Sequence, residues 1–251
     1  MMKNPNLKPL LSKVGRAIGD FNLIEKGDRI AVGVSGGKDS SCLLFVLNQI
    51  RKISPVKFDL QPIHVAMGWP VDITPLTQFA AGLGVDLIIE ETMIGPTVFE
   101  YRQEPNPCSL CAKMRRGALH NAAVFAGCNK VALAHHQDDV IETLFMSMFL
   151  EGRLQTFLPR TYLDRKNLTV IRPLVYTPEN LVRETVANIG LSVVQNPCPA
   201  NGHTKRQEMK ELVAQLSESI PDVRNKMVSA LRNVNFNNLW PQKHQYPKPG
   251  V

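Results

Sequence analysis

The chain has 251 residues, of which 44% are hydrophobic and 20% are charged. This balance excludes collagen-like, low-complexity and wholly disordered proteins, and it indicates a globular protein with a sizeable core. The 29 Lys and Arg outnumber the 22 Asp and Glu, and the resulting net charge of +7 suits a polyanionic partner such as nucleic acid. No apolar run approaches the roughly 18 to 20 residues that a bilayer span needs, so we expect a soluble protein with no membrane partner.

The beginning of the sequence and its cysteines bear on the cellular compartment. Charged residues at positions 8, 13, 16 and 20 replace the unbroken apolar stretch of a secretory signal, so we expect a cytoplasmic protein. Five cysteines are an odd number, which favours reduced thiols or metal ligands over a disulfide framework.

The hydrophobic pattern predicts a helix first and then strands and helices in alternation. Apolar residues at spacings of three and four predict the first helix between Leu7 and Phe21. Strands are expected over residues 29–34, 58–66, 85–90, 130–134 and 168–171, and helices over residues 43–50, 74–83, 111–126 and 138–150. This alternation predicts an α/β fold, Rossmann-like, with a parallel sheet and helices on both faces.

Further helices are predicted after the last strand. Pro178 opens one that extends to Ile189, and two amphipathic helices follow over residues 204–219 and 222–234, before a Pro-rich tail. We therefore expect three parts: an N-terminal helix in residues 1–28, a core domain in 29–200, and C-terminal helices with a tail in 201–251.

The glycine-rich turn after the first predicted strand is the clearest chemical feature. Ser35, Gly36, Gly37, Lys38 and Asp39 lie between a strand and a helix, where backbone N–H groups and the helix dipole converge on an anion. The turn is not a Walker motif, because Lys38 is followed by Asp39. The alternative is a glycine turn kept for geometry alone.

This turn resembles that of the PP-loop ATP pyrophosphatases, whose signature SGGxDS matches residues 35–40. The resemblance implies that ATP is cleaved between its α and β phosphates and that AMP passes to a carbonyl oxygen of the substrate. Lys38 would neutralise charge on the phosphates, and Asp39 would help to hold Mg²⁺. The resemblance also implies that His64 and Val65 flank the adenine. The other candidate nucleotide contacts are Val34, Ser35, Gly36, Gly37 and Ser40 in the loop, and Arg115 and His135 elsewhere.

Three cysteines are candidate metal ligands. Cys108 and Cys111 open a predicted helix with the Cys-x-x-Cys spacing, which is shared by redox sites, half zinc sites and iron–sulfur sites. Cys198, in a predicted loop far along the chain, is the third candidate. Three thiols leave one metal position open, although His203 or a second chain could complete the set. Two further cysteines, Cys42 and Cys128, lie at apolar positions and are interpreted as packing residues.

Four stretches together resemble the tRNA 2-thiocytidine synthetases, the TtcA-like sulfurtransferases. They are residues 35–40, 108–117, 135–149 and 171–174. The resemblance implies a 4Fe-4S cluster on Cys108, Cys111 and Cys198, whose unliganded iron would carry sulfur. The sequence departs from the family at Gln195, where a cysteine is frequent, and at residues 68–71, where a longer acidic loop is usual.

A second acidic site is expected where the fourth predicted strand meets its helix. Asp138 and Asp139 follow His135 and His136 there, at the edge of the sheet where ligands gather. Asp138 would bind Mg²⁺ or orient the target base, and His135 would contact the nucleotide. The alternative, helix capping, fits one of the two aspartates.

Several basic residues could contact RNA phosphates without reading sequence. They are Arg115, Arg116 and Arg172 in the core, and Lys205, Arg206, Lys210, Arg224, Lys226 and Arg232 in the C-terminal helices. For each residue alone, a solvated surface position is the plainer interpretation.

The combined prediction is an ATP-dependent tRNA sulfurtransferase that adenylates a base carbonyl, such as C2 of cytidine 32, and replaces the oxygen by sulfur. The implied cofactors are ATP, Mg²⁺ and the 4Fe-4S cluster, and the implied partners are tRNA and a protein persulfide or sulfide. A homodimer is left open. One alternative is a PP-loop synthetase with a nitrogen nucleophile, which the cysteines argue against. The other is an RNA-binding protein with structural zinc.

Overall fold

The computed structural model describes residues 7–102, 107–189 and 205–240. Its centre is a six-stranded sheet with the strand order β3-β2-β1-β4-β6-β5. The strands are β1 (Arg29–Gly33), β2 (Asp59–Ala66), β3 (Ile88–Glu91), β4 (Lys130–Ala132), β5 (Arg160–Leu163) and β6 (Leu168–Ile171). All neighbours pair in parallel except β5 and β6, which are antiparallel.

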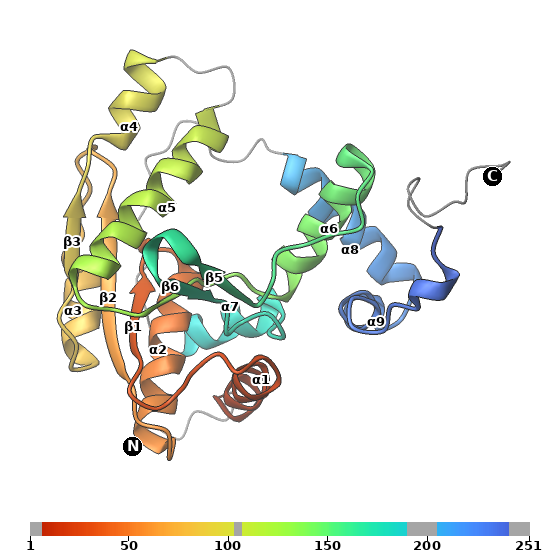
Figure 1. The fold of residues 1–251 in the computed structure, drawn as a ribbon, viewed down its shortest axis with the longest axis horizontal. Coiled ribbons are helices and arrows are strands. Elements are labelled where there is room, and N and C mark those ends of the chain that lie inside the picture. The colour runs from red at the N-terminus through yellow and green to blue at the C-terminus, as the bar shows by residue number, and fades with distance from the viewer. Residues whose placement is uncertain (1–6, 103–106, 190–204, 241–251) are drawn as a thin grey trace, which may run out of the picture.

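The sheet carries helices on both faces, as the hydrophobic pattern predicts. Helices α1 (Leu7–Phe21), α2 (Lys38–Ile53), α3 (Thr74–Gly82) and α7 (Glu179–Asn188) share one core cluster, whereas α5 (Pro107–Phe125) packs in another (Figure 1). Successive β1 residues separate the two layers: Ile30 and Val32 join the first cluster and Ala31 the second. This alternation is expected of a strand buried on both faces, because successive side chains point to opposite sides.

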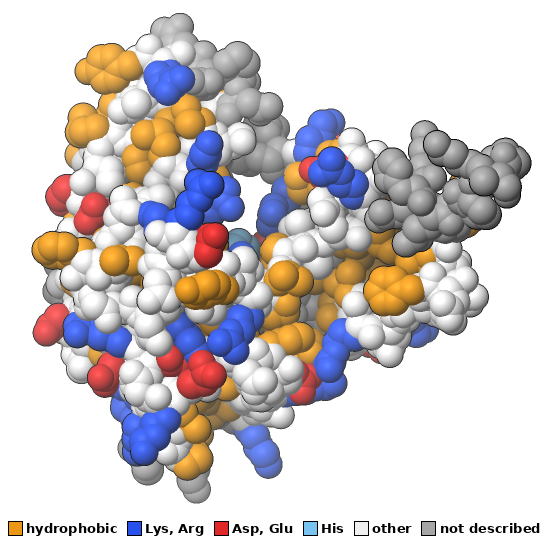
Figure 2. All heavy atoms as spheres, viewed as in Figure 1, with side chains coloured by type: hydrophobic (Ala, Val, Ile, Leu, Met, Phe, Trp, Pro, Cys, Tyr) orange, Lys and Arg blue, Asp and Glu red, His pale blue; other side chains and the backbone are white. Residues whose placement is uncertain are grey.

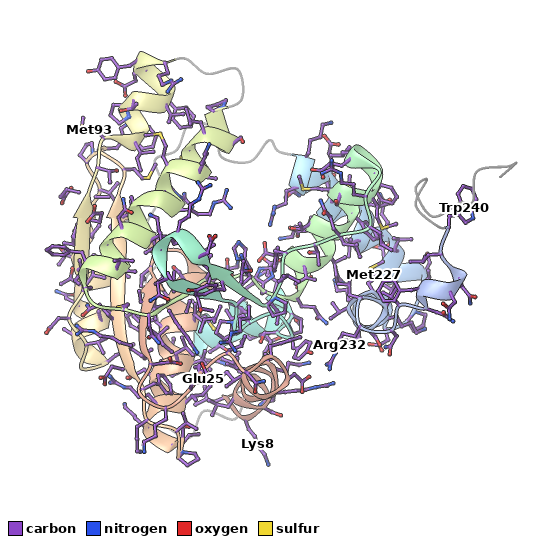
Figure 3. All side chains as sticks on the ribbon, in the orientation of Figure 1. Lys8, Glu25, Met93, Met227, Arg232 and Trp240 are labelled. Carbon is purple, nitrogen blue, oxygen red and sulfur yellow. The ribbon has the colours of Figure 1, made fainter. Side chains whose placement is uncertain are left out.

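The C-terminal helices pack on the helix that follows β4. This helix, α6 (Gln137–Glu151), shares a core cluster with α8 (Lys205–Ser219) and α9 (Val223–Ala230). Met227 of α9 packs against this cluster, and Arg232, just after α9, pairs with Asp20 of α1 at 2.7 Å (Figure 3). The predicted division of the chain at residues 28 and 200 stays a prediction.

The structure differs from the sequence expectation in several local features. The edge strand β5 was not expected, and neither were the short helix α4 (Ile94–Pro96) and the π-helix η1 (Thr97–Tyr101) that follow β3. Strand β3 begins at Ile88, because residues before it form the turn after α3, where Gly84 has a φ of +73°. The helix expected over 222–234 ends at Ala230. No helix in the described part of the chain is long and apolar enough to cross a membrane.

Candidate active site

The predicted phosphate loop connects β1 to α2. Gly36 adopts a φ of +84°, a left-handed conformation that suits glycine, and Gly37 caps the helix without a side-chain bond. Ser40 holds the loop: its Oγ accepts from the Ser35 backbone N–H at 3.1 Å and donates to the Gly37 carbonyl at 3.0 Å. The glycines and the N-terminus of α2 therefore present backbone donors to an anion.

The loop lysine is held between two carboxylates. Lys38 Nζ lies 3.0 Å from Asp39 Oδ2 and 3.1 Å from Glu179 Oε1. Burial acts to lower the pKa of Lys38, but these two carboxylates outweigh it and the pKa is raised. Lys38 is therefore a cation fixed at the mouth of the loop.

Glu179 connects this loop to the C-terminal helices. Its Oε2 lies 2.7 Å from Lys210 Nζ of α8, so one carboxylate pairs with two lysines. Burial acts to raise the pKa of Glu179, but the bonds from Lys210 and Lys38 lower it to about 2. Its backbone N–H also donates to Asp138 Oδ2 at 2.7 Å. The sequence analysis missed Glu179, although a carboxylate opening the helix after the last central strand was a usable signal.

The second acidic site lies beside the loop, and its two aspartates have different roles. Asp139 caps α6, because its Oδ2 accepts from the His136 backbone N–H at 2.9 Å while His136 Nδ1 accepts from its N–H at 3.4 Å. Asp138 accepts from Glu179 and lies 3.1 Å from Arg224 Nε. His136 Nε2 lies 3.8 Å from Asp39 Oδ1 and joins this site to the loop.

Three cations from the C-terminal helices pair with acids of this site. Arg206 contacts Asp139 at 2.7 Å, and Arg224 and Lys210 contact the acids already described. Glu142, one turn further along α6, lies 3.7 Å from Arg206, and its pKa is raised to about 7 by burial and then by the charge of Asp139. Helices α8 and α9 thus supply positive charges that pair with the carboxylates of the acidic site.

His64 and Val65 lie at the end of β2, next to the loop. His64 is buried, and its Nδ1 lies 2.8 Å from the carbonyl of Val34. Val65 is half-buried and packs between two core clusters. The structure therefore places both residues beside the start of the loop, as a role at the nucleotide requires.

His135 lies between an aromatic ring and a guanidinium group. Its ring packs 4.8 Å from the ring of Phe157, and its Nδ1 accepts from Arg172 Nε at 3.3 Å. Burial lowers the pKa of His135 to about 4, so the imidazole is neutral at physiological pH. It can act there as a hydrogen-bonding group but not as a cation.

Two predicted metal ligands lie at the start of α5. Cys111 is buried and packs with Ile94 and Val98, whereas Cys108, one turn earlier, is exposed. The third predicted ligand, Cys198, and the alternative His203 lie outside the described residues. Cys42 and Cys128 are buried, and burial raises the pKa of Cys42 to about 12, so its thiol is inert near neutral pH.

A hollow separates α5 from the helices α6 and α8, and Lys and Arg side chains gather on both of its sides (Figure 2). Helix α5 contributes Lys113, Arg115 and Arg116, which are exposed. A separate cavity of about 520 Å³ lies between the ends of β2 and β3, and Trp69 and Met93 are among the residues that line it. It coincides with the segment 68–71 that departs from the family pattern.

The family follows from comparison with known proteins. A family model described as PP-loop domain matches residues 10–216. A tRNA-cytidine(32) 2-sulfurtransferase from Pelobacter propionicus is 40% identical over 98% of this chain and 93% of that protein. The chain belongs to this family. A second member, from Syntrophotalea carbinolica, is 41% identical over 90% of this chain and 88% of its own chain. These relatives confirm the family resemblance that the motifs predict.

The fold is shared with a solved structure. The U34-tRNA thiolase NcsA from Methanococcus maripaludis, determined with its 4Fe-4S cluster, has a TM-score of 0.75 and 24% sequence identity, and the match covers 90% of this chain and 78% of NcsA. This similarity confirms the predicted α/β fold of the PP-loop type.

Proposed function

We propose that this protein is an ATP-dependent tRNA sulfurtransferase that converts cytidine 32 to 2-thiocytidine. One observation carries the proposal: relatives named tRNA-cytidine(32) 2-sulfurtransferase align with nearly the whole chain at about 40% identity. The phosphate loop, the adjoining acids and the Cys-x-x-Cys helix support it. The alternatives with a nitrogen nucleophile or structural zinc have no such support.

The chemistry explains why an ATP loop is needed. The C2 oxygen of cytidine is a poor leaving group, so the base oxygen first attacks the α-phosphorus of ATP and releases pyrophosphate. Sulfur at the oxidation level of sulfide then adds to C2 as the nucleophile, and the C–O bond breaks with AMP as the leaving group, so the step involves no net oxidation or reduction. In this scheme the loop N–H groups and Lys38 stabilise charge on the departing pyrophosphate. A water-excluding site protects the adenylated base from hydrolysis.

The acids of the site fit a magnesium ion. Asp39 Oδ1 is buried and has no hydrogen-bond partner in the described part of the chain, which leaves it available to a cation. Asp39 would therefore hold Mg²⁺ between the loop and the phosphates of ATP. Each oxygen of Asp138 already accepts a hydrogen bond from the protein, so its predicted role as a ligand would use a remaining lone pair of this carboxylate.

The cysteines fit a metal cluster by donor type and placement. Cys108 and Cys111 are three residues apart in one helix, so their side chains lie on one side of it. With Cys198 as the predicted third ligand, they would hold a 4Fe-4S cluster, which supplies a binding site for sulfur when it is present. Within the described residues no group of three His, Cys, Asp or Glu could hold a metal ion, so the set depends on Cys198.

The link through Glu179 predicts an effect on the ATP step. Replacement by Gln leaves one neutral oxygen for two ammonium groups, so Lys38 keeps Asp39 as its carboxylate partner but loses the second carboxylate that fixes its orientation. We expect Glu179→Gln to lower kcat/KM for ATP by about tenfold, the loss typical of a hydrogen bond to a charged group, with no change in the KM for tRNA. The matched control is Glu184→Gln, an exposed residue of the same helix. Equal losses for both substrates would contradict this role.

The remaining parts of the prediction are proposals of the same kind. A protein persulfide or sulfide would supply the sulfur, and the protein would act in the cytoplasm. Arg115 would contact ATP phosphates or RNA from the exposed side of α5. The homodimer stays open.

The function is tested by mass spectrometry of tRNA nucleosides from cells that lack the protein. We expect 2-thiocytidine to disappear and to return with the wild-type gene, while other thiolated nucleosides stay unchanged. Unchanged 2-thiocytidine would refute the proposed function.

A further inference from the structure

A group of basic side chains lies between α5 and the β5–β6 hairpin, and Arg172 connects it to His135 of the candidate active site. Arg116 and His120 lie one turn apart on α5, Lys166 lies in the short helix between the two strands, and Arg172 follows β6. Lys166 Nζ donates to Asn121 of α5, so the hairpin and the helix are in direct contact. Three separate elements therefore bring positive charge to one place.

Arg172 is the most informative member, because it is half-buried and has no carboxylate partner among the described residues. Its Nη1 donates to the carbonyl of Leu158 at 2.6 Å, and its Nε donates to His135. The guanidinium lies 5.0 Å from the centre of the Phe157 ring. Thr161 Oγ1 accepts a longer bond at 3.5 Å. All these partners are neutral, and a cation removed from water is costly unless an anion compensates it.

In the described part of the chain, the neighbouring groups have no acidic partner either. Arg116 Nε donates to the carbonyl of Ala112 at 3.3 Å, and Lys166 donates to an amide oxygen. His120 Nε2 is buried and has no hydrogen-bond partner in the described part of the chain. Burial lowers the pKa of His120, and the charges of Lys166, Arg116 and Arg172 lower it further, so the imidazole is neutral and able to donate one hydrogen bond.

The C-terminal helices show the opposite arrangement. There, Arg206, Lys210 and Arg224 are each paired with a carboxylate of the acidic site. Here, no carboxylate pairs with Arg116, Lys166 or Arg172 among the described residues. A group of cations without carboxylate partners is suited to bind an anion from outside the chain.

We propose that Arg116, Lys166, Arg172 and His120 form a subsite for a backbone phosphate of the RNA substrate. The inference rests on the proposed function. A phosphodiester carries one charge and two free oxygens, which suit a guanidinium fork and a nearby ammonium group. ATP phosphates are assigned to the loop that begins α2, and α2 packs against the opposite face of the sheet from α5. Arg172 also contacts His135, so the bound phosphate would position a nucleotide beside the adenylation site.

The test measures binding by the full-length protein of unmodified tRNA over a range of salt concentrations, and of α,β-methylene-ATP with Mg²⁺. We expect Arg116→Met and Lys166→Met each to weaken tRNA binding by about 5- to 10-fold near 0.1 M salt and to reduce the slope of log K against log salt by about one. Affinity for the ATP analogue should stay within about twofold. The control Lys52→Met removes the same charge from the exposed far end of α2.

Two results would overturn the subsite while leaving the proposed function intact. One is tRNA affinity and a salt slope equal to those of the Lys52→Met control. The other is loss of ATP-analogue binding with unchanged tRNA binding, which would assign the phosphate to the nucleotide. If the wild-type protein binds no tRNA, the proposed function and the subsite fail together. Thermal unfolding of each variant shows whether the fold is retained, and Arg172→Lys, which keeps the charge but not the fork, should lose part of the affinity.

Discussion

Lys38→Met should reduce tRNA-dependent pyrophosphate release by about 100- to 1000-fold, the loss expected when one preorganised donor to a developing charge is removed. Lys38 is held by Asp39 and Glu179 at the mouth of the loop, so its charge is in place before ATP arrives. The protein therefore pays no reorganisation cost when the bond between the α and β phosphates breaks. Methionine keeps most of the length of the side chain and removes only the charge.

The measurement is pyrophosphate and AMP formation in the presence of substrate tRNA. Lys52→Met, at the other end of the same helix, is the control for loss of one positive charge and should retain wild-type rates. Binding of tRNA by Lys38→Met should be unchanged. A fall of less than about tenfold would show that the loop backbone, and not Lys38, carries the stabilisation.

Replacement of either Cys108 or Cys111 by serine should reduce tRNA thiolation to background and leave ATP-analogue binding intact. The two thiols lie at the start of α5, on a different element from the loop that would hold the phosphates. Serine keeps the size of the side chain but is a poor ligand for iron, so we expect iron and acid-labile sulfide to be lost from anaerobically purified protein. The same result is expected for Cys198→Ser.

Cys128→Ala is the matched control, because Cys128 is buried in the core cluster under α5 and takes no part in the proposed site. It should keep iron, sulfide and thiolation. Full thiolation by Cys108→Ser and Cys111→Ser would contradict the proposal that these cysteines hold the cluster. Stoichiometric zinc with no iron in the wild-type protein would instead support a structural role for the thiols.

Local chemistry explains what the sequence predicted well. The central strands and most helices follow from the spacing of apolar residues, because a buried face must repeat with the period of its element. The SGGKDS turn and the Cys-x-x-Cys pair are contiguous, and the residues needed for their chemistry are neighbours in the chain. For this reason the fold class and the family could be predicted before any coordinates were considered.

Contacts between distant segments account for what the sequence did not predict. Strand β5 has only four residues and pairs as an edge strand with β6, so its own pattern carries little signal. The different roles of Asp138 and Asp139 depend on tertiary contacts. Asp139 caps α6, whereas Asp138 accepts a hydrogen bond from the start of α7.

The amino-acid sequence by itself determined the order of the elements, the phosphate loop and the first two thiols, because each depends on residues close together in the chain. The tertiary structure alone decided that Glu179 joins Lys38 to Lys210, and that the half-buried Arg172 donates to neutral partners. Such pairings depend on how helices far apart in the sequence pack around one sheet. The spacing of residues along the chain does not predict that packing.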